Sequence, residues 1–287
     1  MHELIKPLQP LRRLAIAWIP ALASAVVLGP LAGALIARLT STDGGPHATL
    51  LVNQTPIIGF ACALGIGLLA AAGGWLGVRI RSPNVGLFSA GIVLAWAAAR
   101  SGRVDEMVIS SHASPFPRLM LEGLVIALVA LLLVEVIRRC RRVAPPEPAL
   151  ADTARATAIG LVAATGAAWV IAADTHKGQT IAAAAAAGAL GAAVARMMLV
   201  SIPPRTLVVI PAALAIAAPA LAQVMSSDAL ESGFAGTITR LGRIAPLDWL
   251  AGGLIGIPLG LVWTDSIAEP QPSAGGAPRT DASAPSS

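Results

Sequence analysis

Residues 138–148 read Arg-Arg-Cys-Arg-Arg-Val-Ala-Pro-Pro-Glu-Pro, and they separate two long apolar halves of the chain. Such a cluster of arginines next to an apolar run is typical of a loop on the cytoplasmic side of a membrane, where basic residues are enriched. The prolines that follow disfavour a helix because they lack a backbone N–H. The stretch therefore predicts a basic, proline-rich cytoplasmic linker over 138–155, and it orients the helices on both sides.

The composition places the chain in a membrane. Of its 287 residues, 56% are hydrophobic and only 12% are charged, whereas soluble proteins carry roughly 25% charged residues. A bilayer-spanning helix needs about 20 mainly apolar residues. Such runs predict an all-α, polytopic integral membrane helical bundle of about eight transmembrane helices, at 13–37, 56–78, 84–99, 119–137, 156–173, 179–199, 206–225 and 246–264. The first run is longer than a signal-peptide core, so we expect it to be retained as a span.

The distribution of basic residues predicts the orientation of these spans. With eight spans, one side of the membrane receives only Arg38, Arg100, Arg103, Arg118, Lys177, Arg240 and Arg243, and all other basic residues fall on the opposite side. The positive-inside bias then makes both termini cytoplasmic. All six tryptophans lie close to predicted span ends, as expected for interfacial side chains. The alanine richness and the preference for arginine over lysine indicate a bacterial protein of the cell (inner) membrane.

The two halves share a plan that predicts a 4+4 parallel internal repeat. The units are 1–137 and 156–264, and 265–287 is predicted to be a disordered cytoplasmic tail rich in alanine, serine and proline. Each unit has a basic, proline-containing turn between its second and third spans, at 79–83 and 201–205. Each also carries a short amphipathic segment before its fourth span, within 101–109 and 226–245, which we expect to lie on the outer surface. The alternative is that any two alanine-rich helical halves resemble each other.

Ionisable residues within membrane spans are candidates for function, and this chain has few of them. Glu122, Asp174, His176 and Asp248 all fall near predicted outer span ends and form a candidate outer polar patch, with Glu122 expected near the outer surface. Imidazole and carboxylate groups together suit zinc. The outer-loop residues His47, His112 and His176 lie near such carboxylates, but none of the histidines shows ligand spacing with another. No metal site, catalytic residue or cofactor is predicted.

The sequence contains no His-Glu-x-x-His helix, Gly-x-Ser-x-Gly elbow or Gly-x-x-x-x-Gly-Lys loop. We therefore expect a multi-pass membrane protein without enzymatic activity, acting as a membrane scaffold or assembly partner. The alternative is a permease or channel-like transporter of a small, weakly polar solute. The expected partners are the lipid bilayer and either another copy of the chain or a membrane protein, without nucleic acid. A water-filled cavity reaching the membrane midplane between the second, sixth and eighth spans would favour transport, whereas a closely packed bundle would favour the scaffold.

Overall fold

The structure is a computed structural model that describes residues 18–111, 114–140, 148–226 and 228–268, and every regular element within them is a helix. The elements in chain order are η2 (Ser24–Leu28), α2 (Gly29–Ile36), α3 (Pro56–Ile80), α4 (Pro83–Arg100), α5 (Val104–Ser111), α6 (Phe116–Arg139), α7 (Leu150–Ile171), α8 (Lys177–Met198), α9 (Pro204–Leu207), α10 (Val209–Met225), α11 (Ala229–Phe234), η3 (Leu241–Arg243) and α12 (Pro246–Ala268). The segment η2 is a single π-helical turn within a helix that runs from Trp18 to Ile36.

Each of the eight predicted runs coincides with one of these helices, so the prediction of an all-α polytopic membrane bundle is confirmed. Among the described residues, seven helices are long and apolar enough to cross a membrane. The helix α4 meets these criteria only together with α5, across a bend of 42°. The chain is thus a multi-pass membrane protein with seven spans, or with eight where α4 and α5 form one bent span.

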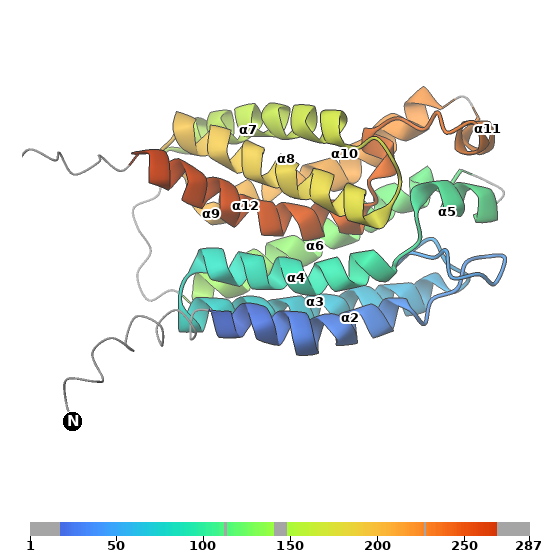
Figure 1. Cartoon of the computed structure of the whole chain (residues 1–287), viewed down its shortest axis with the longest axis horizontal. Helices are drawn as coiled ribbons and strands as arrows, with labels where there is room; N and C mark the ends of the chain where they lie inside the picture. Colours follow the sequence, from blue (N-terminus) through green and yellow to red (C-terminus); the bar gives the residue numbers. More distant parts are fainter. Residues whose placement is uncertain (1–17, 112–113, 141–147, 227, 269–287) are drawn as a thin grey trace, which may run out of the picture.

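The long helices run side by side along the long axis of the molecule (Figure 1). The described chain begins and ends at the same end of the bundle, where α9 also lies, whereas α5 and α11 lie at the opposite end. We call the end with α9 the inner end and the end with α5 and α11 the outer end. These names follow the orientation that the basic residues predict.

The last helix, α12, lies at the centre of the bundle and contacts α4, α6, α8 and α10. Small residues permit its closest contact, because a Cβ atom added at Gly256 would lie 2.0 Å from the carbonyl oxygen of Ala185 on α8. The central position also corrects one expectation. Trp249 is fully buried near the start of α12 instead of lying at a membrane interface.

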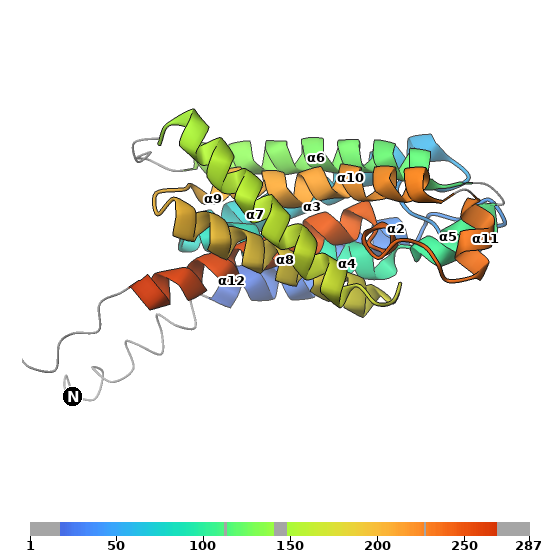
Figure 2. The ribbon, with the colours of Figure 1, turned by 90° about the horizontal axis from the view of Figure 1, so that it is seen from above.

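The two halves of the chain exchange contacts at their third and fourth spans. The helix α4 of the first half packs on α12 of the second, and α10 of the second half packs on α6 of the first. Figure 2 shows α6 and α10 side by side along most of their length. The short helices α5 and α11 also contact each other. This reciprocal pairing is consistent with the predicted repeat, which stays a prediction.

The short outer helices are helical as expected, but α5 does not present its apolar side to the bilayer surface. Val104, Met107 and Val108 of α5 are buried in a small outer core with Phe116 and Leu119, the first apolar residues of α6. Their apolar side chains find protein partners because α5 and α11 fold over the outer end together. Phe234 of α11 remains exposed.

Three predicted boundaries need correction. The expected linker over 138–155 is partly helical, because α6 continues to Arg139 and α7 already begins at Leu150. In the last turn of α6, Glu135 forms ion pairs with Arg138 and Arg139, which stabilises the helix beyond its apolar run. Similarly, α12 extends past Thr264 to Ala268. The rest of the linker, 141–147, and of the predicted tail, 269–287, lies outside the described residues.

Candidate functional site

Glu122 is completely buried, which corrects the expectation that it lies near the outer surface. It stands in the second turn of α6, where the loop after the first span folds over it. Its Oε2 atom accepts hydrogen bonds from the hydroxyl of Thr49, at 2.5 Å, and from the backbone N–H of Leu51, at 2.9 Å. Its Oε1 atom is buried and has no hydrogen-bond partner within the described part of the chain. Glu122 therefore anchors the 49–51 segment to α6.

Asp248 is also completely buried, in the first turn of α12. Both of its carboxylate oxygens lie 3.1 Å from the Nζ atom of Lys177, the first residue of α8. The hydroxyl of Thr180, one turn further along α8, donates to Asp248 Oδ2 at 2.8 Å. The three residues join the outer ends of α8 and α12, and the ion pair is almost entirely shielded from water.

Asp174 and His176 remain exposed, and they bind each other instead of joining the buried carboxylates. The Nδ1 atom of His176 lies 2.6 Å from Asp174 Oδ2. The backbone N–H of Thr175 donates to Asp174 Oδ1, and this bond, followed by the contact with His176, holds the pKa of Asp174 below its usual value. The proposed outer polar patch is thus divided into an exposed pair and two buried carboxylates on different helices.

The histidines and carboxylates of the outer loops do not converge on a metal site. His47 Nδ1 contacts Glu106 at 3.0 Å, and no group of three or more His, Cys, Asp or Glu side chains in the described ranges could hold a metal ion. His112 lies outside those ranges. The two cysteines, Cys62 and Cys140, are free.

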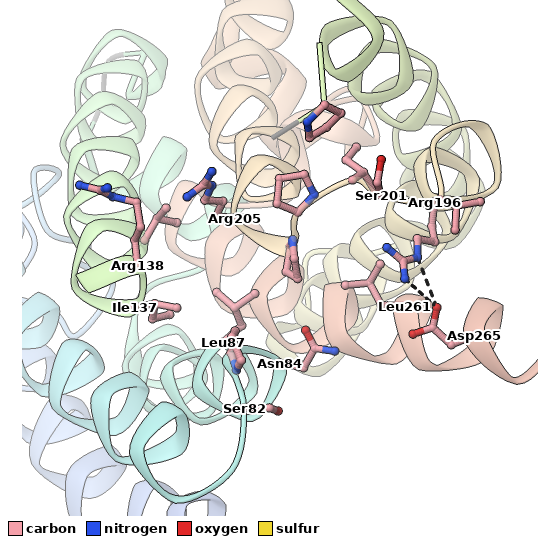
Figure 3. A pocket seen from close by; sticks show the side chains of 17 residues that line it. Ser82, Asn84, Leu87, Ile137, Arg138, Arg196, Ser201, Arg205, Leu261 and Asp265 are labelled. Atoms are coloured by element: carbon pink, nitrogen blue, oxygen red, sulfur yellow. Dashed lines mark hydrogen bonds and ion pairs between the residues drawn. The ribbon is translucent and has the colours of Figure 1, made fainter. Parts of the chain in front are cut away.

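At the inner end, a pocket of about 500 Å³ opens between the two halves of the chain. Figure 3 shows that its labelled side chains come from α4, from the ends of α6, α8 and α12, and from the turn before α9. The apolar part of its wall includes Leu87, Ile137 and Leu261. Polar groups at the rim include Ser82, Asn84 and Ser201.

Three arginines and one carboxylate set the charge of this inner pocket. Arg196 donates from Nε, at 3.3 Å, and from Nη2, at 3.1 Å, to the same oxygen of Asp265. Arg138 is bonded to Glu135 on its own helix, and its guanidinium points away from the pocket (Figure 3). Arg205 is half-buried on the side of the pocket opposite Asp265. The pocket thus carries an excess of positive charge.

Sequence analysis did not predict this inner pocket, although it identified the turns that form it. Residues 79–83 and 201–205 were predicted to be equivalent turns in the two units. Parts of both, Ser82–Pro83 and Ser201–Arg205, line the same pocket. Arginine and proline next to apolar spans are also what ordinary cytoplasmic loops contain, so their composition alone does not indicate a cavity.

No protein-family model matches the chain, and comparisons with curated proteins and with solved structures found no match.

Proposed function

We propose that this multi-pass membrane protein is a non-enzymatic scaffold or assembly partner in the cell membrane, with both termini in the cytoplasm. The observation that carries the proposal is the backbone contact between α8 and α12, the sixth and eighth predicted spans. A Cβ atom added at Gly260 would lie 2.1 Å from the carbonyl oxygen of Ala189, and one added at Gly188 would lie 2.7 Å from the carbonyl oxygen of Gly253. Two helices at this separation leave no path for a solute between them.

The chemistry of the same seam also supports a structural role. Between Lys177 and Arg196 on α8, and between Asp248 and Asp265 on α12, the sequence has no ionisable residue. Transporters that couple to protons or cations place ionisable groups within the membrane. The buried carboxylates of this chain instead lie toward the outer end, where they accept hydrogen bonds from Thr49 and Thr180.

A permease for a small, weakly polar solute is the second candidate, and the inner pocket is the observation that favours it. The pocket lies between the two halves, while the outer end carries the α5–α11 contact and the buried Lys177–Asp248 pair. A cavity open at one end only is what an alternating-access transporter presents in one of its states. However, the residues that line it, such as Leu87 and Val134, lie within about two helical turns of the inner ends of α4 and α6.

Solute uptake into proteoliposomes tests the two functions against each other. The purified chain is reconstituted, and the uptake of glycerol, urea and neutral amino acids is compared with protein-free vesicles. The scaffold predicts equal rates in both. Uptake above the protein-free rate that is abolished by Leu87→Trp, which fills the pocket, would overturn the scaffold and establish the permease.

Partner capture provides the positive test of a scaffold. A photo-crosslinking residue is placed at Leu128, which points outward from the middle of α6, and in a matched protein at Val162 of α7. A scaffold predicts a discrete product of one mass from at least one face in native membranes. Only lipid adducts from these and further outward positions around the bundle would contradict it.

A further inference from the structure

We propose that the inner pocket binds a phosphate group, carried either by the headgroup of an anionic phospholipid or by a free phosphate ester. The inference goes beyond a scaffold role and does not depend on it. It begins with position, because the pocket lies at the inner ends of five apolar helices. These ends meet the layer of the bilayer where lipid phosphates are found.

The charged groups of the pocket suit a phosphate. Arg196 and Arg205 approach the pocket from different elements, α8 and α9, and both side chains are only partly exposed. Guanidinium groups bind phosphate through two parallel N–H donors, and such charge-assisted bonds are about twice as strong as neutral ones. Two arginines on separate elements can hold one phosphate between them without either having to leave its helix.

The start of α4 adds neutral donors on a third side. Ser82 caps this helix of 18 residues, and its hydroxyl accepts from the backbone N–H of Val85. A helix N-terminus carries a partial positive charge that favours anions. The Asn84 amide, in the first turn, lies at the edge of the pocket across from Arg205 (Figure 3). The first turn of α4 and the two arginines therefore present positive potential to the same space.

The pocket volume and its apolar wall fit a ligand larger than an ion. Cavities that bind small molecules typically enclose about 300–1,000 Å³, and this pocket encloses about 500 Å³. Leu87 and Leu261 form its apolar side, which suits the glycerol backbone of a phospholipid or the carbon part of a phosphate ester.

Asp265 is the internal competitor for the ligand. It holds Arg196 through a single carboxylate oxygen, and its own side chain is 52% exposed. Exposed ion pairs contribute little free energy, since water and salt screen them. A phosphate can displace Asp265 and take both donors of Arg196. Removing the carboxylate charge should therefore strengthen binding.

The test uses the full chain in phosphatidylcholine nanodiscs and measures binding of phosphatidylglycerol by native mass spectrometry. Arg196→Gln and Arg205→Gln should each weaken binding about tenfold, the loss expected for a charged hydrogen-bond donor. The matched control is Arg155→Gln, which removes one exposed charge from the same end of the molecule on α7 and should change affinity less than twofold. Asp265→Asn should strengthen binding several-fold, an effect that damage to the fold does not produce.

Competition with inorganic phosphate and glycerol 3-phosphate identifies the source of the phosphate group. Displacement of the lipid by these soluble probes indicates a site for free phosphate esters, whereas retention of the lipid indicates a headgroup site. Equal losses in Arg155→Gln and in the pocket variants would overturn the proposal, because they would reflect the charge of the whole inner surface. Failure of the lipid and of both soluble probes to bind the native chain would overturn it as well.

Discussion

The Nζ atom of Lys177 lies 3.1 Å from both carboxylate oxygens of Asp248, although 71 residues separate them in the chain. The pair joins the first turn of α8 to the first turn of α12. Because the carboxylate is completely buried, the loss of its cation leaves an uncompensated charge inside the protein.

We expect Lys177→Met to destabilise the protein by about 3 kcal/mol, the usual cost of breaking a buried ion pair from one side. Thermal or denaturant unfolding in detergent measures the change. The double variant Lys177→Met/Asp248→Leu should regain most of the lost stability, because neither charge remains. A double variant as unstable as the single one would show that the pair itself is not the cause.

The seam between α8 and α12 should not tolerate even one added methyl group. A Cβ atom at Gly256 would lie 2.0 Å from the carbonyl oxygen of Ala185, so Gly256→Ala must push the helices apart. We expect a loss of roughly 1–3 kcal/mol on unfolding, as in overpacked cores.

The matched control for the seam is Gly166→Ala on α7, where an added Cβ atom meets nothing within 4 Å. This change should leave stability equal or slightly higher, since alanine favours a helix more than glycine does. Equal effects at the two glycines would refute the close approach of α8 and α12.

His176 should influence the titration of Asp174 only in part. The lowered pKa of Asp174 arises first from the Thr175 N–H and then from His176, so His176→Asn should raise this pKa without restoring it fully. A lowered pKa gives stability that is present above the ordinary value of about 3.9 and is lost as the pH falls through the lowered value. The variant should therefore lose this stability at a higher pH.

Carboxyl ¹³C NMR titration measures the change at Asp174. Asp43 provides the internal control, because its pKa is lowered first by the hydroxyl of Ser41 and then by the Gly45 N–H. Its titration should be the same in both proteins. An unchanged Asp174, or one that returns to the ordinary value, would contradict the assignment of causes.

The orientation predicts where fused reporters are active. An alkaline phosphatase fused after Pro148 should be inactive because this position follows the basic cluster on the cytoplasmic side. The same reporter fused after Asp174, beyond the next span, should be active. The reverse pattern would invert the assignment of inner and outer ends.

The helices of this protein were predictable, and their neighbours were not. A run of apolar residues about 20 long identifies a span without reference to any other part of the chain, as for α6 and α10. Which face a helix buries depends on its neighbours. Trp249 was expected at an interface because it stands near a span end, but the contacts of α12 enclose it completely.

The buried carboxylates show the same limit. Glu122 stands near a predicted outer end, and nothing local in the sequence shows that Thr49 and Leu51 cover it from 71 or more residues away. The pair of Lys177 with Asp248 is equally remote in sequence. Both residues were predicted to belong to one polar region, which was right in its location along the spans and wrong in its exposure.

The most enclosed helix of the bundle is also the last described one to be synthesised. Chains fold as they emerge, so α4, α6, α8 and α10 must enter the membrane before α12 exists to join them. Until then, the carbonyl groups of Ala185 and Ala189 face lipid or a temporary partner in place of Gly256 and Gly260. The completion of the whole bundle therefore waits for a single late insertion event, and a protein that stops short of Pro246 lacks the helix on which both halves meet.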